Sequence, residues 1–199
     1  MSDVKKLEII GTIKDGIAIG VKNIGPILVN LLLWILTCWI PYLNVGTTIG
    51  LAVGIVKKAS KDEPIPMTEI FNPIYRKYMG EYFLVCGLVG VGVALGTAFL
   101  FIPGMVIAIA WCFAPLITID KGKNPTEAIY LSNKATYGNK WRMFGVLFLA
   151  SLAFGIVIGI LAIIPAVGII LAIAAMLFMM FVLIGIQASM YKQLTSNIS

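Results

Sequence analysis

The stretch LAIIPAVGIILA, residues 161–172, places a proline and a glycine in the middle of the longest charge-free run of the sequence. No charged residue occurs between Arg142 and Lys192, and a continuous helix over those 49 residues would be about 74 Å long. The hydrocarbon core of a bilayer is only roughly 30 Å thick. One straight helix is therefore too long, whereas a hairpin of two helices with Pro165 and Gly168 at its turn fits.

The composition of the whole chain is that of an integral membrane protein. Of its 199 residues, 60% are hydrophobic and only 12% are charged, which lies outside the usual range of soluble domains. We expect a single membrane domain over residues 1–199. Histidine is absent and the three cysteines lie in apolar runs at no metal-ligand spacing, so we expect neither a metal site nor a cofactor.

Two further runs repeat the pattern of the first. Residues 23–56 and 82–119 lack charged residues, exceed the length of about 20 residues that one crossing needs, and contain a proline near a glycine. These are Pro41 with Gly46 and Pro103 with Gly104. The sequence therefore predicts an all-α membrane protein of six transmembrane helices, formed by three hairpins with Pro/Gly turns over residues 23–56, 82–119 and 143–191. The first run is barely long enough, so its helices are expected to be short, tilted or re-entrant.

The charged residues allow a test of this arrangement. All 15 Lys and Arg residues lie outside the three runs, in the lead 1–22, the connectors 57–81 and 120–142, and the C-terminal tail. Because each hairpin returns the chain to the side it left, all these cations fall on one face. By the positive-inside rule we expect that face, with both termini, to be cytoplasmic.

Amphipathic interfacial helices are predicted outside the runs. An apolar stripe at helical spacing follows residues 4–22 and consists of Leu7, Ile10, Ile13, Ile17 and Val21. Residues 124–135, NPTEAIYLSNKA, predict a short surface helix capped by Asn124. Cationic and aromatic residues flank the hairpins and are candidates for contact with anionic lipid headgroups or an acidic partner: Lys22, Arg76, Lys77, Lys140, Trp141 and Arg142. The alternative is that they only fix orientation.

Small residues recur every four positions on several predicted helices. The sets are Gly46, Gly50 and Gly54, then Gly92 and Gly96, then Ser151, Gly155 and Gly159. Such stripes predict close helix packing, either within the chain or in a homo-oligomer around a pore. Pro115 lies inside the predicted fourth helix and frees the carbonyl of Trp111, which indicates either a kink for packing or exposed backbone at a substrate site.

Two classes of function fit these features. Coupled transport and catalysis are not expected, because the runs hold no charged residue and the connectors hold no catalytic or phosphate-binding motif. One class is an oligomeric protein for passive permeation or lipid-linked solute handling. The other is a lipid-organising scaffold or accessory subunit without transport. The expected partners are the lipid bilayer, anionic lipids, a second copy and another membrane protein, but not nucleic acid.

Three stretches also resemble a known group of proteins. FAPLITID at 113–120, EAIYLSNKA at 127–135 and IQASMYKQL at 186–194, with the three hairpins, are similar to the YciC-like proteins and to the membrane domain fused to some glycerophosphodiester phosphodiesterases. The resemblance implies six helices in a bacterial or archaeal membrane, hence a multi-pass protein of a prokaryotic cytoplasmic (inner) membrane. It implies no reaction or substrate, and the phosphodiesterase activity is not carried over because that domain is not in this sequence.

Overall fold

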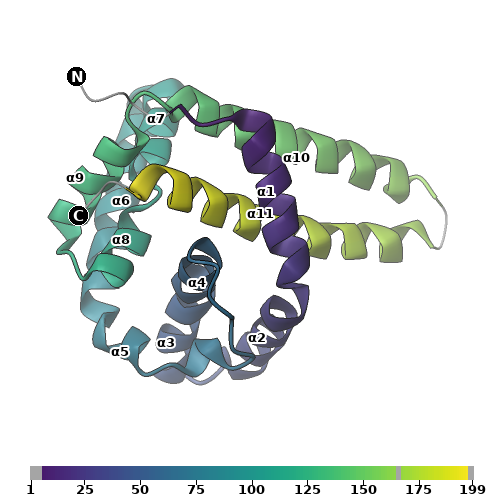
Figure 1. Ribbon diagram of the computed structural model, residues 1–199, viewed down its shortest axis with the longest axis horizontal. Helices are drawn as coiled ribbons and strands as arrows, with labels where there is room; N and C mark the ends of the chain where they lie inside the picture. Colours follow the sequence, from purple (N-terminus) through teal and green to yellow (C-terminus); the bar gives the residue numbers. More distant parts are fainter. Residues whose placement is uncertain (1–5, 165–166, 197–199) are drawn as a thin grey trace.

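The computed structural model is all-helical over the residues it describes, 6–164 and 167–196 (Figure 1). Its elements in chain order are α1 (Ile9–Lys22), α2 (Ile24–Thr37), α3 (Leu43–Ile49), a π-helical turn η1 (Gly50–Gly54), α4 (Ile55–Ser60), a 3-10 turn η2 (Glu69–Phe71), α5 (Ile74–Lys77), α6 (Met79–Phe99), α7 (Phe101–Trp111), α8 (Ala114–Lys121), α9 (Pro125–Thr136), α10 (Lys140–Ala162) and α11 (Gly168–Thr195). Pro165 lies outside the described residues, so its role at a turn stays a prediction.

Four spans are long and apolar enough to cross a membrane by length and composition: α6, the joined α7 and α8 (Phe101–Lys121), α10 and α11. They are the four arms of the predicted hairpins at 82–119 and 143–191. Helices α1 and α2 pass the same test only together, and they are bent by 68° where they meet. They form a broken span or a re-entrant pair. The described residues thus hold four or five candidate spans, and the six predicted crossings are not confirmed.

The first predicted hairpin is the one that departs from a simple crossing. Its first arm, α2, has 14 residues and rises about 21 Å, which is less than the hydrocarbon thickness. Its second arm is divided into α3, η1 and α4. The 34-residue run at 23–56 is too short for two full crossings and a turn, which is the physical reason for the difference.

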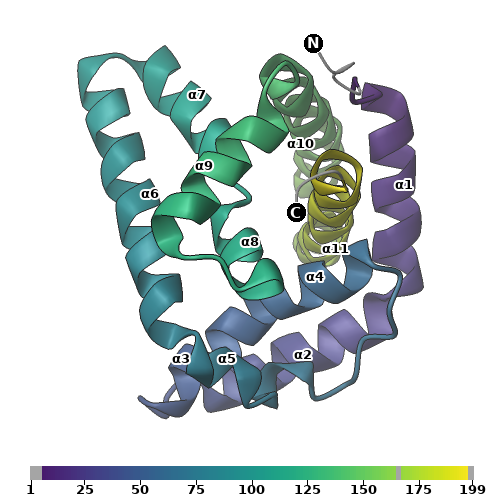
Figure 2. The ribbon, with the colours of Figure 1, turned by 60° about the vertical axis from the view of Figure 1, so that its left-hand side comes forward.

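The hairpins also point in different directions. Figure 2 shows α6 along its length but α11 nearly end-on, and in Figure 1 α10 and α11 project sideways from the rest of the chain. Three parallel hairpins are therefore not what the structure shows. The length of a charge-free run indicates each hairpin but carries no information on the angle between two of them.

All three predicted turns can be compared, at least in part, with the structure. Pro41 lies in the turn between α2 and α3, whereas Gly46 lies inside α3. The break between α6 and α7 lies at Leu100, whose backbone is extended, and Pro103 and Gly104 belong to the first turns of α7. The predicted Pro103 turn was therefore placed a few residues late, because proline is tolerated in the first turn of a helix. Gly168 begins α11, and a Cβ there would lie 2.2 Å from the Leu161 carbonyl oxygen. Only glycine fits this close turn.

Helix α1 packs across α11 through small residues (Figure 1). Its buried face consists of Thr12, Gly16 and Gly20. A Cβ at Gly185 of α11 would lie 2.0 Å from the Gly16 carbonyl oxygen, so the two backbones are in contact. Much of the predicted apolar stripe of α1 points outward, with Ile10 65% exposed. The helix itself is confirmed, and its glycine face is what binds it to the protein.

The predicted glycine stripes fall into two groups. Gly46, Gly50 and Gly54 face the connector at Arg76, Ile70 and Tyr75, whereas Gly92 and Gly96 face α7 at Trp111, Ile107 and Gly104. All five therefore pack within the chain. Ser151, Gly155 and Gly159 of α10 differ, because Ser151 is exposed and no described atom lies within 4 Å of a Cβ built at Gly155 or Gly159.

Candidate functional site

A buried carboxylate at the end of α8 joins three distant parts of the chain. The Asp120 side chain is only 5% exposed. Its Oδ1 accepts a hydrogen bond from Lys61 Nζ and lies 3.5 Å from Lys57 Nζ. Its Oδ2 accepts a hydrogen bond from the Tyr191 hydroxyl at 3.0 Å. The charge of Asp120 is therefore balanced by two lysines of the first connector region, and its second oxygen is hydrogen-bonded by a phenol of the last helix.

Further contacts join polar segments that are distant in the sequence. Lys192 of α11 pairs with Asp62 of the first connector. Near the N-terminus, the Leu7 amide donates to Asn139 Oδ1 at 2.8 Å, and an Arg142 guanidinium nitrogen donates to the Leu7 carbonyl at 2.9 Å. Direct contacts of this kind cannot reach across a hydrocarbon layer of roughly 30 Å. Each joined pair of segments, the first connector with the end of α11 and the lead with the second connector, therefore lies on one side of any membrane that the helices cross.

A cavity of about 400 Å³ with a basic lining opens beside Asp120. We call it the basic pocket, and it is lined by Ser60, Lys61, Asp120, Lys121, Tyr191, Lys192, Thr195 and Ser196. Lys61 pairs with Asp120 and Lys192 pairs with Asp62, so Lys121 contributes the excess positive charge of the lining. Lys121 Nζ donates to the Thr195 carbonyl at 3.3 Å, which directs this ammonium group toward the end of α11. Such a lining attracts an anion, and lysine is a common point-charge partner of phosphate.

A second cavity of about 310 Å³ lies between α7, α10 and α11. We call it the apolar pocket, and it is lined by Ala108, Ile109, Cys112, Phe113, Met143, Leu147, Leu183, Gln187 and Met190. Gln187 supplies the one amide of this lining and no charged residue belongs to it. The pocket is suited to a hydrocarbon group.

The two pockets meet at a pair of aromatic rings. Phe113 lines the apolar pocket, Tyr191 lines the basic pocket, and their rings make an edge-to-face contact with centroids 5.5 Å apart. Both rings are buried, at 0% and 2% exposure. Along α11, Gln187 of one pocket and Thr195 of the other are separated by about 12 Å of helix rise. The pockets therefore follow one another along the same helices.

At the break between α7 and α8, next to Pro115, side chains of α9 form hydrogen bonds with backbone groups. Pro115 lies in the first turn of α8. Ser132 Oγ accepts from the Phe113 amide at 3.2 Å and donates to the Ala110 carbonyl at 2.8 Å. The Ala110 carbonyl and the Phe113 amide at the break are thus bonded within the chain, which favours the prediction of a packing kink over a substrate site at exposed backbone. The stretches 113–120, 127–135 and 186–194 all contribute to this region.

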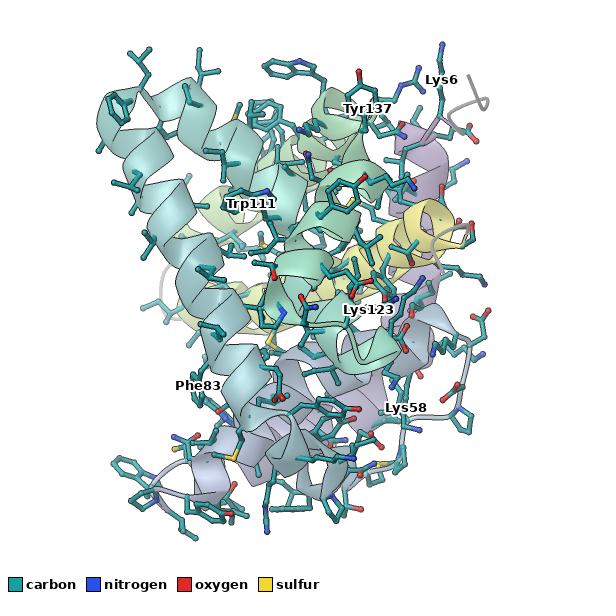
Figure 3. All side chains as sticks on the ribbon, turned by 90° about the vertical axis from the view of Figure 1, so that its left-hand side faces the viewer. Lys6, Lys58, Phe83, Trp111, Lys123 and Tyr137 are labelled. Atoms are coloured by element: carbon teal, nitrogen blue, oxygen red, sulfur yellow. The ribbon has the colours of Figure 1, made fainter. Side chains whose placement is uncertain are left out.

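The cations singled out from the sequence lie elsewhere. Arg142 holds the N-terminal segment, Lys140 donates to Asn133 Oδ1, and Arg76 lies over the Tyr42 ring. Lys77 and Trp141 are exposed, and Lys22 lines a small separate cavity near Asp62. None of the six lines the basic pocket. In Figure 3 the labelled Lys6, Lys58 and Lys123 lie on one side, opposite Phe83 of α6.

The lysines of the basic pocket were missed because three separate segments supply them. The available signal was Asp120, a carboxylate that directly follows an apolar run and precedes Lys121. A charge at the end of a membrane segment indicates a partner, but the sequence does not show which cation it meets.

A second buried polar cluster fastens the first connector to α2. Asn30 is fully buried, donates to the Pro26 and Pro66 carbonyls, and accepts from the Ile70 amide. Glu69 is 3% exposed and accepts a hydrogen bond from the Tyr75 hydroxyl. Burial, together with the hydrogen bond and charge of Glu69, raises the pKa of Tyr75 above its usual range. These groups satisfy one another, so this cluster is structural.

The geometry does not assemble a metal site, since no group of three His, Cys, Asp or Glu side chains able to hold a metal ion occurs among residues 6–164 and 167–196. Comparison with known proteins adds no relative: no family model, no curated protein and no solved structure matches the chain.

Proposed function

We propose that this protein is a non-enzymatic, multi-pass protein of a prokaryotic cytoplasmic membrane that binds anionic lipid headgroups at its cytoplasmic end. The observation that carries the proposal is the basic pocket beside the buried Asp120, at the ends of two candidate spans, Phe101–Lys121 and Gly168–Thr195. Basic pockets between membrane helices on the cytoplasmic side are a recurrent way to hold anionic headgroups.

The proposed topology places both termini and both connectors in the cytoplasm. It is supported by the contacts that join these segments on one side, Lys192 with Asp62 and Leu7 with Asn139, and by the absence of cations from the three charge-free runs. In this arrangement the hairpins α6–α8 and α10–α11 each return the chain to its starting side, with α1–α2 and α3–α4 inserted as short or re-entrant segments.

The proposal is tested by lipid binding to the intact protein. Purified protein is offered vesicles of phosphatidylcholine with and without phosphatidylglycerol, and the lipid retained after re-extraction is identified by native mass spectrometry. We expect enrichment of phosphatidylglycerol and its loss in the double variant Lys121→Gln and Lys192→Gln. This variant keeps the ion pairs of Asp120 and removes the exposed Lys192–Asp62 pair, which contributes little to stability. Each lysine near an anionic surface contributes about 1 kcal/mol, which is about fivefold in binding per lysine.

The matched control is Lys123→Gln with Lys134→Gln, two cations of the second connector that do not line the basic pocket. It should retain phosphatidylglycerol as the unchanged protein does. Equal retention by both double variants, or no preference for phosphatidylglycerol in the unchanged protein, would refute headgroup binding at this pocket.

Passive permeation by a homo-oligomer is the second candidate, and one observation favours it. The small-residue face Ser151, Gly155 and Gly159 of α10 has open space in front of its glycines, as close association with another membrane helix requires. Liposomes containing only this protein should then pass small solutes, and Gly155→Leu should abolish both flux and oligomer. A monomer in native lipid with no flux excludes this candidate and leaves the lipid-binding role.

A further inference from the structure

The apolar pocket has the size and lining of a ligand site. Its volume of about 310 Å³ lies within the range of about 300–1,000 Å³ that is usual for small-molecule sites. Three membrane helices contribute aliphatic side chains, among them Ala108, Leu147 and Leu183. A ligand whose hydrocarbon part enters this pocket from water gains about fourfold in affinity for each methylene group buried.

The two pockets lie in the order in which an amphiphile carries its hydrocarbon chain and its ionic headgroup. Both Phe101–Lys121 and α11 run from the apolar pocket to the basic pocket, with Cys112 and Gln187 at the apolar end and Lys121 and Thr195 at the basic end. The separation is about 12 Å along α11 and about 14 Å along Phe101–Lys121, which an extended acyl chain spans. A hydrocarbon chain and an ionic headgroup on one molecule match this polarity.

We infer that the site binds a whole anionic single-chain amphiphile, with its phosphate in the basic pocket and its acyl chain in the apolar pocket alongside Phe113 and Tyr191. The inference rests on the proposed headgroup binding and adds the chemical class of the ligand. An inorganic phosphate fills only the basic pocket, and an uncharged lipid fills only the apolar one. The amphiphile alone uses both.

The Phe113–Tyr191 pair separates the ligand's two halves. Tyr191 is held by its hydrogen bond to Asp120, and Phe113 is the fully buried ring that faces it. In the inferred complex the acyl chain lies on the Phe113 side of this pair, and the phosphate lies on the Tyr191 side, near the lysines that surround Asp120. Because the ligand occupies both pockets, its affinity should depend on its chain length as well as on its charge.

The test compares three probes on the full-length protein in amphipol: palmitoyl lysophosphatidic acid, hexanoyl lysophosphatidic acid and monopalmitoylglycerol. We expect the palmitoyl phosphate to bind at least tenfold more tightly than either of the others. Ala108→Phe fills part of the apolar pocket and should reduce the advantage of the long chain to less than threefold, while hexanoyl binding persists. Ala153→Phe, at an exposed site of α10, is the matched control and should change neither value.

The outcomes separate this inference from the proposed function. If Ala108→Phe keeps the full long-chain advantage while Lys121→Gln with Lys192→Gln loses phosphate binding, headgroup binding stands and the inference fails. If neither variant changes binding, both fail. A readout on the unchanged protein guards against misfolding of variants: palmitoyl lysophosphatidic acid with a mid-chain diazirine should crosslink to Met143, Leu147 or Leu183. Crosslinks confined to lipid-facing residues outside the apolar pocket would overturn the inference.

Discussion

Lys192 Nζ of the last helix pairs with Asp62 Oδ2 of the first connector, although 130 positions separate the two residues. The hydrogen bond and charge of Lys192 hold the pKa of Asp62 below its usual range. Both side chains are exposed, so this pair contributes little to stability. The pair is nevertheless informative about topology, because it shows that the C-terminal end of α11 lies beside the first connector.

The crossing of α1 and α11 at Gly185 should not tolerate a larger residue. In Gly185→Ala the new Cβ would lie 2.0 Å from the Gly16 carbonyl oxygen, so the two helix backbones must separate. We expect the free energy of unfolding in detergent to fall by about 1–3 kcal/mol. Gly155→Ala has open space around it and should leave stability unchanged or slightly raised. Equal losses in both variants would show that the crossing is not tightly packed.

Ser132 should be required at the break between α7 and α8. Ser132→Ala removes the hydroxyl that bonds to the Phe113 amide and leaves the Ala110 carbonyl with only the longer hydrogen bond from Thr136, at 3.4 Å. A buried polar group that loses its partner costs about 1–3 kcal/mol, and thermal unfolding in detergent measures this loss. Ser151→Ala on the exposed face of α10 is the control, expected within about 0.5 kcal/mol of the unchanged protein. A stable Ser132→Ala protein would argue that another group bonds to the break.

The raised pKa of Tyr75 predicts that the folded protein loses stability at alkaline pH. Its pKa is raised by burial and by Glu69, so the folded protein keeps the phenol proton where the unfolded chain, with a pKa of about 10, releases it. This contribution is fully present below about pH 10 and is lost as the pH rises through the higher pKa of the folded state. Unfolding measured between about pH 9 and 11 should therefore show a smaller loss for Tyr75→Phe than for the unchanged protein. Identical pH profiles would contradict the Tyr75 assignment.

The sequence predicted the membrane segments where charge and length constrain them most. The runs at 82–119 and 143–191 correspond to the four candidate spans, because a charge-free stretch of that length has to fold back within a bilayer. The surface helix at 124–135 is confirmed by α9 and its cap, in which Asn124 Oδ1 accepts from the Glu127 amide at 2.8 Å. Here the local residues alone determine the structure.

The packing of α1 could not be predicted from its apolar stripe. In a soluble protein the apolar face of a helix is the buried one, but a lipid environment leaves apolar side chains such as Ile10 and Val21 on the outside. The face that packs consists of Thr12, Gly16 and Gly20, whose small size permits close approach. The apolar pattern of the lead therefore indicated an interfacial helix but did not identify the face that packs against α11.

The basic pocket could not be predicted from the sequence, for a different reason. Lys61, Lys121 and Lys192 come from three segments that are brought together only by the packing of α4, α8 and α11. Nothing in their spacing links them. The flanking cations that the sequence favoured, such as Arg142, instead hold the N-terminal segment.

The account depends on the polar ends lying together on the cytoplasmic side, and cysteine labelling tests this most directly. Lys123→Cys is introduced after Cys38, Cys86 and Cys112 have been replaced by alanine, with Phe101→Cys at the exposed tip of the α6–α7 hairpin as the comparison. With a membrane-impermeant maleimide, we predict labelling of position 123 only in inverted vesicles and of position 101 only in intact cells. Labelling of position 123 in intact cells would contradict the account.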